Sequence, residues 1–131
     1  MRLTNQEIWL AYQNLAKLEK EKLPVKTALE VAMLMTVLKP AYMTLEGENR
    51  KLIMRYGKLN NKTGQIAVDI TADEGAGYAQ DFGEILTAKW ISDIDFQKIE
   101  LPKEVKDKID PNTLVPLTEK FIEKTEVSII E

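Results

Sequence analysis

The sequence predicts an α+β fold, and the spacing of its apolar residues and prolines supports this class. Apolar residues recur at helical spacing in the N-terminal half, and they alternate with polar residues in later segments. Prolines divide the C-terminal tail into pieces too short for long elements. We therefore expect a helical hairpin or kinked helices, packed with a small antiparallel β-sheet and a short-helical tail. No linker divides the chain, so residues 1–131 are expected to form a single domain.

The first helix is predicted to begin at Thr4. Thr4 and Glu7 have the Thr-x-x-Glu spacing of a capping box, in which each side chain bonds the backbone N–H of the other residue. Leu3 and Ile8 stand on either side of this box, where apolar side chains close over a helix start. The residue before a proline avoids helical geometry, so the helix is expected to end before Pro24.

A second helix is predicted from about Val25 to Leu38, and its apolar residues leave almost no polar face. A helix that is apolar all round is buried on all sides, which so small a chain cannot achieve alone. We therefore expect a homo-oligomer, most simply a dimer. Its interface is expected to include Val31, Leu34, Met35 and Leu38.

Pro40 is predicted either to kink this helix or to break it. Helical spacing of apolar residues resumes at Tyr42 and continues to Tyr56, followed by Gly57, a residue type common after helix ends. A break would give a helical hairpin, and a kink would give one long helix. Both alternatives are open from the sequence.

The β part is predicted in two alternating segments, from Ile66 to Ile70 and from Ala88 to Glu100, which we expect to pair with each other. Between them, Thr71 and Glu74 repeat the capping-box spacing, which predicts a glycine-weakened helix to about Leu86. In the tail, one-turn helices are expected to pack over the core. Their expected anchors are Leu114, Leu117, Phe121 and Ile122.

The composition argues against several classes of function. The chain has no cysteine and no histidine, which removes thiolate nucleophiles, zinc-thiolate sites and the commonest general base and transition-metal ligand. We therefore expect no enzyme, no cofactor and no metal site, and Asp93 and Asp95 are interpreted as a solvated strand face. The net charge of -3, with both signs interspersed, argues against general nucleic-acid binding. No signal peptide and no membrane span is expected.

The best candidate binding site is a group of cations with one aromatic side chain. It consists of Lys26, Arg50, Lys51, Arg55 and Tyr56. Such a group could bind phosphate or an acidic partner through charge-assisted hydrogen bonds. The alternative is a solvated helix end, where cations are favoured by the helix dipole. If Pro40 only kinks the helix, Lys26 is far from Arg55 and a second subunit must complete the group.

Three features follow one another along the chain: a Leu-Pro-x-Lys turn at Leu23, a helix interrupted by Pro40, and a basic helix end at Tyr56-Gly57. In these features the chain resembles a family of small phage-encoded proteins of unknown function, from phages and prophages of Gram-positive bacteria. It departs from that pattern at Met33-Leu34, where relatives carry polar residues, and in the added segment 124–131. The resemblance implies a phage protein in the host cytoplasm.

Size, the absence of catalytic residues and the resemblance together favour binding over turnover. We expect a non-enzymatic phage accessory protein that acts stoichiometrically. It would inhibit a bacterial defence protein or sequester a small anionic signal, and the cationic group favours this function. The alternative is a phage structural or tail-assembly factor.

Overall fold

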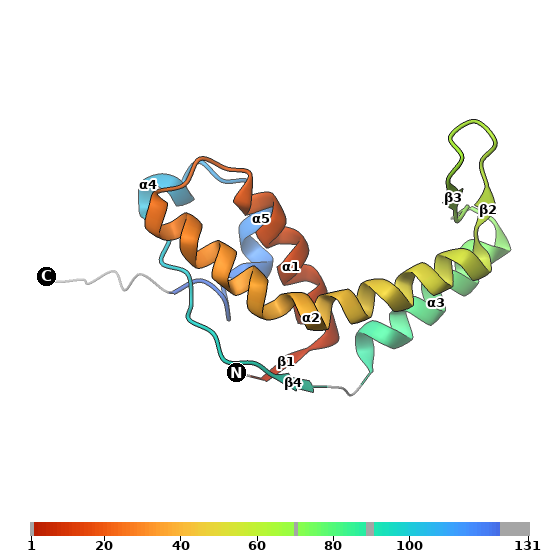
Figure 1. Cartoon of the computed structure of the whole chain (residues 1–131), viewed down its shortest axis with the longest axis horizontal. Helices are drawn as coiled ribbons and strands as arrows, with labels where there is room; N and C mark the ends of the chain where they lie inside the picture. The colour runs from red at the N-terminus through yellow and green to blue at the C-terminus, as the bar shows by residue number, and fades with distance from the viewer. Residues whose placement is uncertain (1, 70, 89–90, 124–131) are drawn as a thin grey trace, which may run out of the picture.

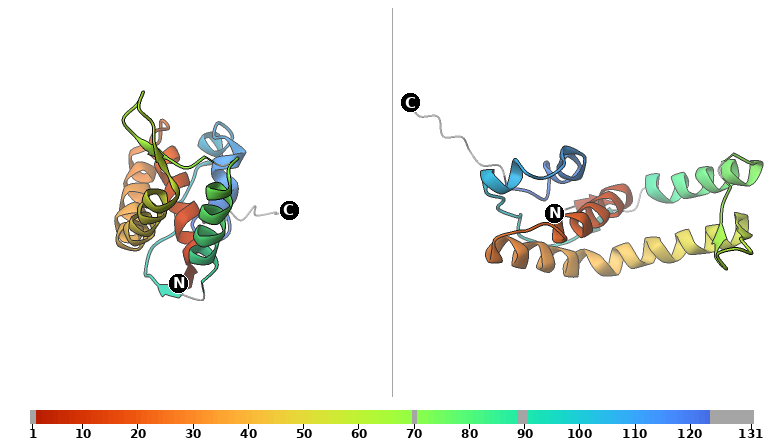
Figure 2. Two further views of the ribbon diagram at one scale, coloured as in Figure 1. Left: turned by 90° about the vertical axis from the view of Figure 1, so that its right-hand side faces the viewer. Right: turned by 90° about the horizontal axis from the view of Figure 1, so that it is seen from above.

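The computed structural model describes residues 2–69, 71–88 and 91–123, and it confirms the α+β class (Figure 1). The elements in chain order are β1 (Arg2–Thr4), α1 (Asn5–Glu19), α2 (Val25–Tyr56), β2 (Lys58–Leu59), β3 (Ile66–Ala67), α3 (Asp73–Thr87), β4 (Ile91–Asp93), α4 (Lys103–Lys106), α5 (Pro111–Leu114) and the 3₁₀ helix η1 (Val115–Leu117). Helices α1, α3 and the tail all lie on one side of the long helix α2 (Figure 2).

The predicted capping box at the start of α1 is confirmed. The Glu7 N–H donates to Thr4 Oγ1 at 3.2 Å, and the Thr4 N–H donates to Glu7 Oε1 at 2.9 Å. Lys120 from the tail adds an ion pair to Glu7 Oε2 at 2.6 Å. Leu3 and Ile8 are fully buried beside this cap. The start of α1 is therefore fixed both by its own side chains and by the C-terminal tail.

Helix α2 is continuous through Pro40, so the alternative of a break at Pro40 is wrong and the kink alternative holds. Its axis changes direction near the middle (Figure 1), as expected where a proline removes one backbone hydrogen bond. Pro40 is exposed, and its carbonyl accepts a hydrogen bond from Thr44 Oγ1 at 3.1 Å. At 1.5 Å per residue, the helix is about 48 Å long.

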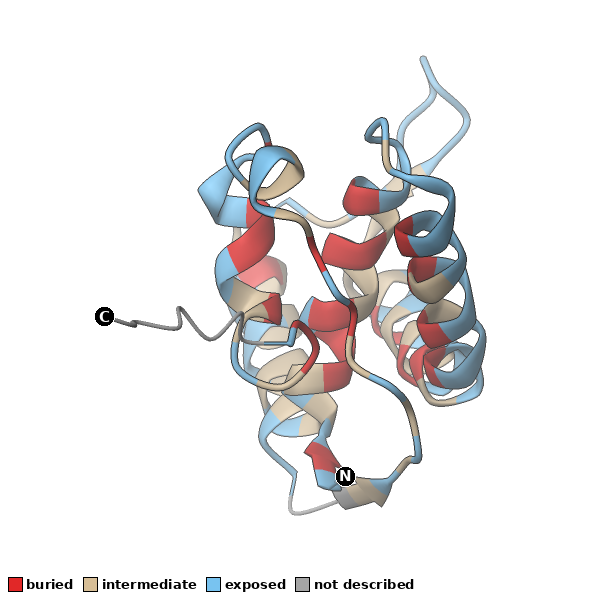
Figure 3. Cartoon of the chain, turned by 90° about the vertical axis from the view of Figure 1, so that its left-hand side faces the viewer, coloured by how far each residue is buried: buried red, intermediate tan, exposed pale blue. Residues whose placement is uncertain are grey.

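Within this chain, helix α2 is not covered on all sides. Helix α2 buries one face only, against α1, α3 and the tail (Figure 3). The buried residues are Thr27, Val31, Leu34, Leu38, Tyr42, Leu45 and Leu52. The expected interface residues Val31, Leu34 and Leu38 are thus part of the chain's own core, and Met35 is half-buried against it. They are not free to form an interface, because α1 and the segment that follows β4 already cover this face.

The predicted strand pairing is also wrong. Strand β4 pairs antiparallel with the N-terminal strand β1, with Leu3 opposite Ser92. Strand β3 instead pairs with β2 in a separate hairpin, whose turn includes Gly64 at φ 71°. The alternation of apolar and polar residues along a strand shows which of its faces is buried. It does not show which other strand lies alongside, so these pairings could not be identified from it. Of the segments predicted as strands, Ile70, Lys89 and Trp90 lie outside the described residues.

The predicted helix before β4 is present as α3, but it lacks the predicted capping box. Its N-cap is Ala72, which has no side-chain hydrogen bond to the helix. Thr71 instead donates from its N–H and its hydroxyl to Asp69 Oδ1, at 2.9 and 2.6 Å. The Asp69 side chain thus forms a local turn that competes with the capping arrangement.

The tail forms short helices over the core, as predicted. The anchors Leu114, Leu117, Phe121 and Ile122 are all buried. The Ile99 N–H donates to the Phe121 carbonyl at 2.8 Å, and the Glu123 N–H donates to the Ile99 carbonyl at 2.9 Å. These bonds hold the end of the described chain against the segment that follows β4.

Candidate functional site

The structure separates the predicted cationic group into two parts. Lys26 lies in the first turn of α2, and Arg50, Lys51, Arg55 and Tyr56 lie near its other end. Because the helix is continuous, residues 26 and 50 are about 36 Å apart along its axis. A single chain therefore does not bring these side chains together.

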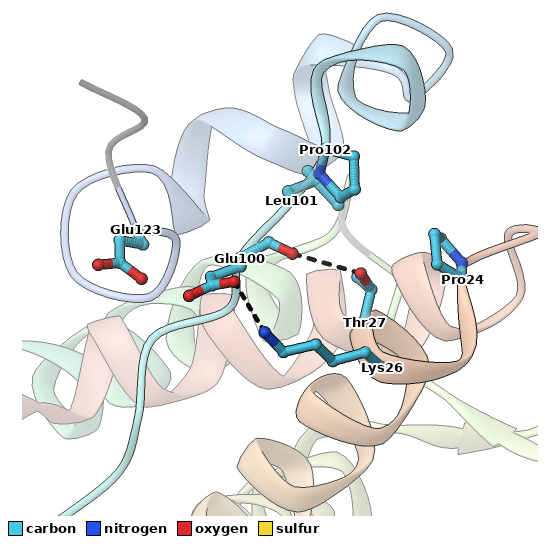
Figure 4. Close-up of a pocket in the computed structure, with 7 residues that line it drawn as sticks. All are labelled: Pro24, Lys26, Thr27, Glu100, Leu101, Pro102 and Glu123. Carbon is cyan, nitrogen blue, oxygen red and sulfur yellow. Dashed lines mark hydrogen bonds and ion pairs between the residues drawn. The ribbon is translucent and has the colours of Figure 1, made fainter. Parts of the chain in front are cut away.

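Lys26 lies at a cavity of about 500 Å³ between the start of α2 and the segment before α4 (Figure 4). Its Nζ lies 3.0 Å from Glu100 Oε2, and the hydrogen bond to Glu100 raises the pKa of Lys26. The hydroxyl of Thr27 donates to the Glu100 carbonyl at 3.3 Å. The positive charge of Lys26 is thus already matched by a carboxylate of the same chain.

The cations at the other end of α2 also have acidic partners. Arg50 Nε lies 2.9 Å from Glu46 Oε1, and Lys51 Nζ lies 3.0 Å from Glu48 Oε1. In each pair the two residues are three or four positions apart, which is the usual spacing of surface ion pairs on a helix. The alternative of a solvated, charge-balanced helix end therefore describes this region better than an anion site does.

Tyr56 and Arg55 attach α3 to the end of α2. The Tyr56 hydroxyl donates to Asp81 Oδ2 at 2.6 Å, and Arg55 Nη1 lies 3.9 Å from the same oxygen. A Cβ on Gly77 would come within 2.7 Å of the Tyr56 ring, so glycine at this position lets the ring lie directly against α3. The predicted site residue Tyr56 thus has a structural role.

We expect a pH-dependent contribution of Tyr56 to stability. The hydrogen bond to the Asp81 carboxylate raises the pKa of Tyr56, because ionisation of the phenol would remove the donor and set two negative charges together. A raised pKa in the fold gives stability that is present below the ordinary tyrosine pKa and is lost as the pH rises through the raised value. Urea unfolding should therefore show wild type more stable than Tyr56→Phe at neutral pH, with the difference disappearing in alkali. An equal difference at both pH values would contradict this role.

The exposed face of α2 that points away from α1 and α3 was not predicted from the sequence. This face carries large apolar side chains that nothing in the described chain covers. They are Val25 (87% exposed), Leu29 (59%), Met33 (60%), Val37 (40%), Met43 (47%) and Met54 (65%). The signal that could have found it is the small size of Ala32, Thr36 and Gly47 between them, since small residues allow a close approach of another helix. We call this surface the outward face.

A second cavity of about 400 Å³ adjoins the outward face. It is lined by Glu30, Met33, Leu34, Val37, Asp95, Phe96 and Gln97. Asp95 thus lies at the edge of an apolar groove and not on a plain strand face. Among the residues that the structure describes, no group of three or more carboxylates could hold a metal ion.

By length and composition, α2 is also long and apolar enough to cross a membrane, whereas no membrane span was expected from the sequence. Only 28% of the most apolar window of α2 is buried within the chain. A core helix of a folded domain meets the same criterion, and α2 carries the core residues Leu34 and Leu38 on one face. The unusual feature of α2 is therefore its uncovered side.

No protein-family model, curated protein or solved structure matches this chain.

Proposed function

We propose that this chain works by stoichiometric binding to another protein, and that the outward face of α2 is the binding surface. The observation that carries this proposal is a row of exposed apolar side chains on a helix whose opposite face forms the core. Contiguous exposed apolar surface of this kind marks interaction sites. Three of the side chains are methionines, which adapt easily to a partner's shape.

A protein partner fits this surface better than a small anionic signal does. Between Lys26 and Lys39 the outward face carries Leu29, Met33 and Val37. The cations expected to bind an anion are paired with carboxylates. The resemblance to small phage proteins supports an accessory protein that inhibits a host defence protein in the cytoplasm. The apolar face suits a phage assembly factor equally, because a long helix with one uncovered face can join subunits.

We expect the double variant Leu29→Asp/Met33→Asp to abolish partner binding, because it places two charges on the proposed apolar surface. The chain should stay folded, because both side chains are exposed. Tagged wild type and variant would be purified from Gram-positive host cells during phage infection, and bound proteins identified by mass spectrometry. The matched control is Val115→Asp, an apolar residue 69% exposed on η1. Wild type and the control should retain a partner at a fixed ratio that the double variant loses.

Equal retention by all three proteins would contradict the proposed surface. Recovery of the chain in purified virions would favour the assembly function over inhibition of a host protein. Several turnovers of any substrate per chain would contradict stoichiometric binding altogether.

A further inference from the structure

We propose that a second copy of this chain packs antiparallel on the outward face of α2. This inference rests on the proposed function, because it takes the outward face to be a protein-binding surface and names its first partner. It is carried by the spacing of the residues on that face, by an unexplained glycine and by the charges on either side.

The outward face follows the spacing of a coiled-coil seam. Steps of four and three residues alternate along it, through Leu29, Met33, Thr36, Pro40, Met43, Gly47, Arg50 and Met54. On the opposite side, buried residues recur every seven positions, at Val31, Leu38, Leu45 and Leu52. Alternating steps of four and three are the pattern that two packed helices share. Helix α2 therefore has one seam filled by its own chain and a second seam that is uncovered.

Gly47 lies on the uncovered seam, and no contact within the described chain requires a glycine there. A Cβ at this position would meet nothing within 4 Å, so packing within the described chain does not require its absence. Glycine inside a helix is destabilising relative to alanine. A close approach of a second helix would explain why a residue without a side chain stands here.

The threonines of this face are also suited to contact with an apolar surface. Thr36 Oγ1 donates to the Ala32 carbonyl at 2.9 Å, and Thr44 Oγ1 donates to the Pro40 carbonyl at 3.1 Å. Their hydroxyls are thus satisfied within α2 itself. Covering them with a second helix leaves no unpaired hydroxyl donor.

The charges that flank the seam select one arrangement. In an antiparallel pair in which Pro40 faces the partner's Met43, Glu30 lies beside the partner's Lys51, and Lys39 lies beside the partner's Glu46. The two-fold symmetry repeats both contacts, so every flanking charge meets an opposite charge. Lys39 has no ion-pair partner within the part of the chain that the structure describes, and this arrangement supplies one.

Other arrangements bring like charges together. A shift of one heptad in one direction places Lys39 beside the partner's Lys39, and a shift in the other places Glu46 beside the partner's Glu46. A parallel pair places Arg50 against the partner's Arg50 inside the seam. Like charges at such positions are destabilising and set partner orientation. The charges thus favour one antiparallel register.

Sedimentation of the full chain tests the dimer. At micromolar concentration, wild type should have about twice the chain mass of 14.9 kDa. Lys39→Glu and Glu46→Lys should each raise the dimer dissociation constant at least tenfold, because each places like charges together in the proposed register. The double variant should return to within a few-fold of wild type, since the pair is restored with its charges exchanged. A merely structural effect of either single change would not be rescued in this way.

Disulfide trapping tests the register, because the chain has no cysteine of its own. Thr36→Cys/Gly47→Cys should form a covalent dimer on mild oxidation, since the proposed register sets these positions opposite each other. Within one chain they are about 16 Å apart, too far for a disulfide. Thr36→Cys/Met54→Cys is the matched control and should cross-link only if the register is shifted by one heptad.

If the chain sediments as a monomer and pellets with phosphatidylglycerol vesicles, the dimer proposal is overturned and the outward face is a membrane-binding surface. A monomer without vesicle binding would also overturn it. In either case, loss of a co-purified partner in Leu29→Asp/Met33→Asp would leave the proposed function standing. A dimer insensitive to the charge exchanges, or trapped only by the control pair, would place the interface or its register elsewhere.

Discussion

Replacing Leu38 by Ala is expected to lower the free energy of unfolding by about 2–5 kcal/mol, the range for a large side chain deleted from a packed core. Leu38 is fully buried on the inner face of α2. Its removal leaves a cavity that the helix cannot close, because α2 is held along its length by α1 and α3. Urea unfolding followed by circular dichroism measures the change.

The matched control is the same substitution on the other face of the same helix. Leu29 is 59% exposed, so Leu29→Ala should change the stability of the monomer by no more than about 0.5 kcal/mol. If the chain dimerises through the outward face, Leu29→Ala should also reduce the dependence of stability on protein concentration. Equal losses for Leu38→Ala and Leu29→Ala at low concentration would contradict the one-sided burial of α2.

Phe121→Ala is expected to cost about 3–5 kcal/mol, because a large aromatic side chain is removed from a buried position. Phe121 is 2% exposed, and its ring stacks on Phe96 with the centroids 5.3 Å apart. Its carbonyl also accepts the bond from Ile99 that holds the tail to the segment after β4. Loss of the ring should therefore loosen the tail from the core, with a lower urea midpoint as the measure.

Val115→Ala is the control within the same tail. Val115 is 69% exposed, so its truncation should leave the midpoint nearly unchanged. Phe121→Leu should fall between wild type and Phe121→Ala, because leucine refills part of the cavity. If Phe121→Ala and Val115→Ala behaved alike, the tail would not be part of the core.

Much of the fold could be predicted from local patterns. The capping box at Thr4 and Glu7 located the start of α1, and the tail anchors, including Phe121, were identified by their apolar character in a proline-containing tail. These features depend on residues close together in the chain. The strand partners could not be predicted, because α1, α2 and α3 separate β1 from β4 along the chain.

The candidate site could be predicted only in part. The sequence identified the cations and Tyr56, but it could not place Glu100 beside Lys26 or Asp81 beside Tyr56. These partners lie on other elements, and ion pairing between elements is decided by packing. The apolar character of α2 was clear from the sequence, whereas which of its residues stay exposed depended on where α1 and α3 pack.

The sequence by itself determined the α+β class, the start of α1 and the absence of cysteine and histidine chemistry, but α1 ends at Glu19, earlier than the predicted end before Pro24. It also determined that α2 carries more apolar surface than one face needs. Only the tertiary structure decided that Pro40 bends α2 without breaking it and that Val31, Leu34 and Leu38 face inward. The physical reason is that helical periodicity sets which residues share a face, while the neighbouring elements set which face is covered.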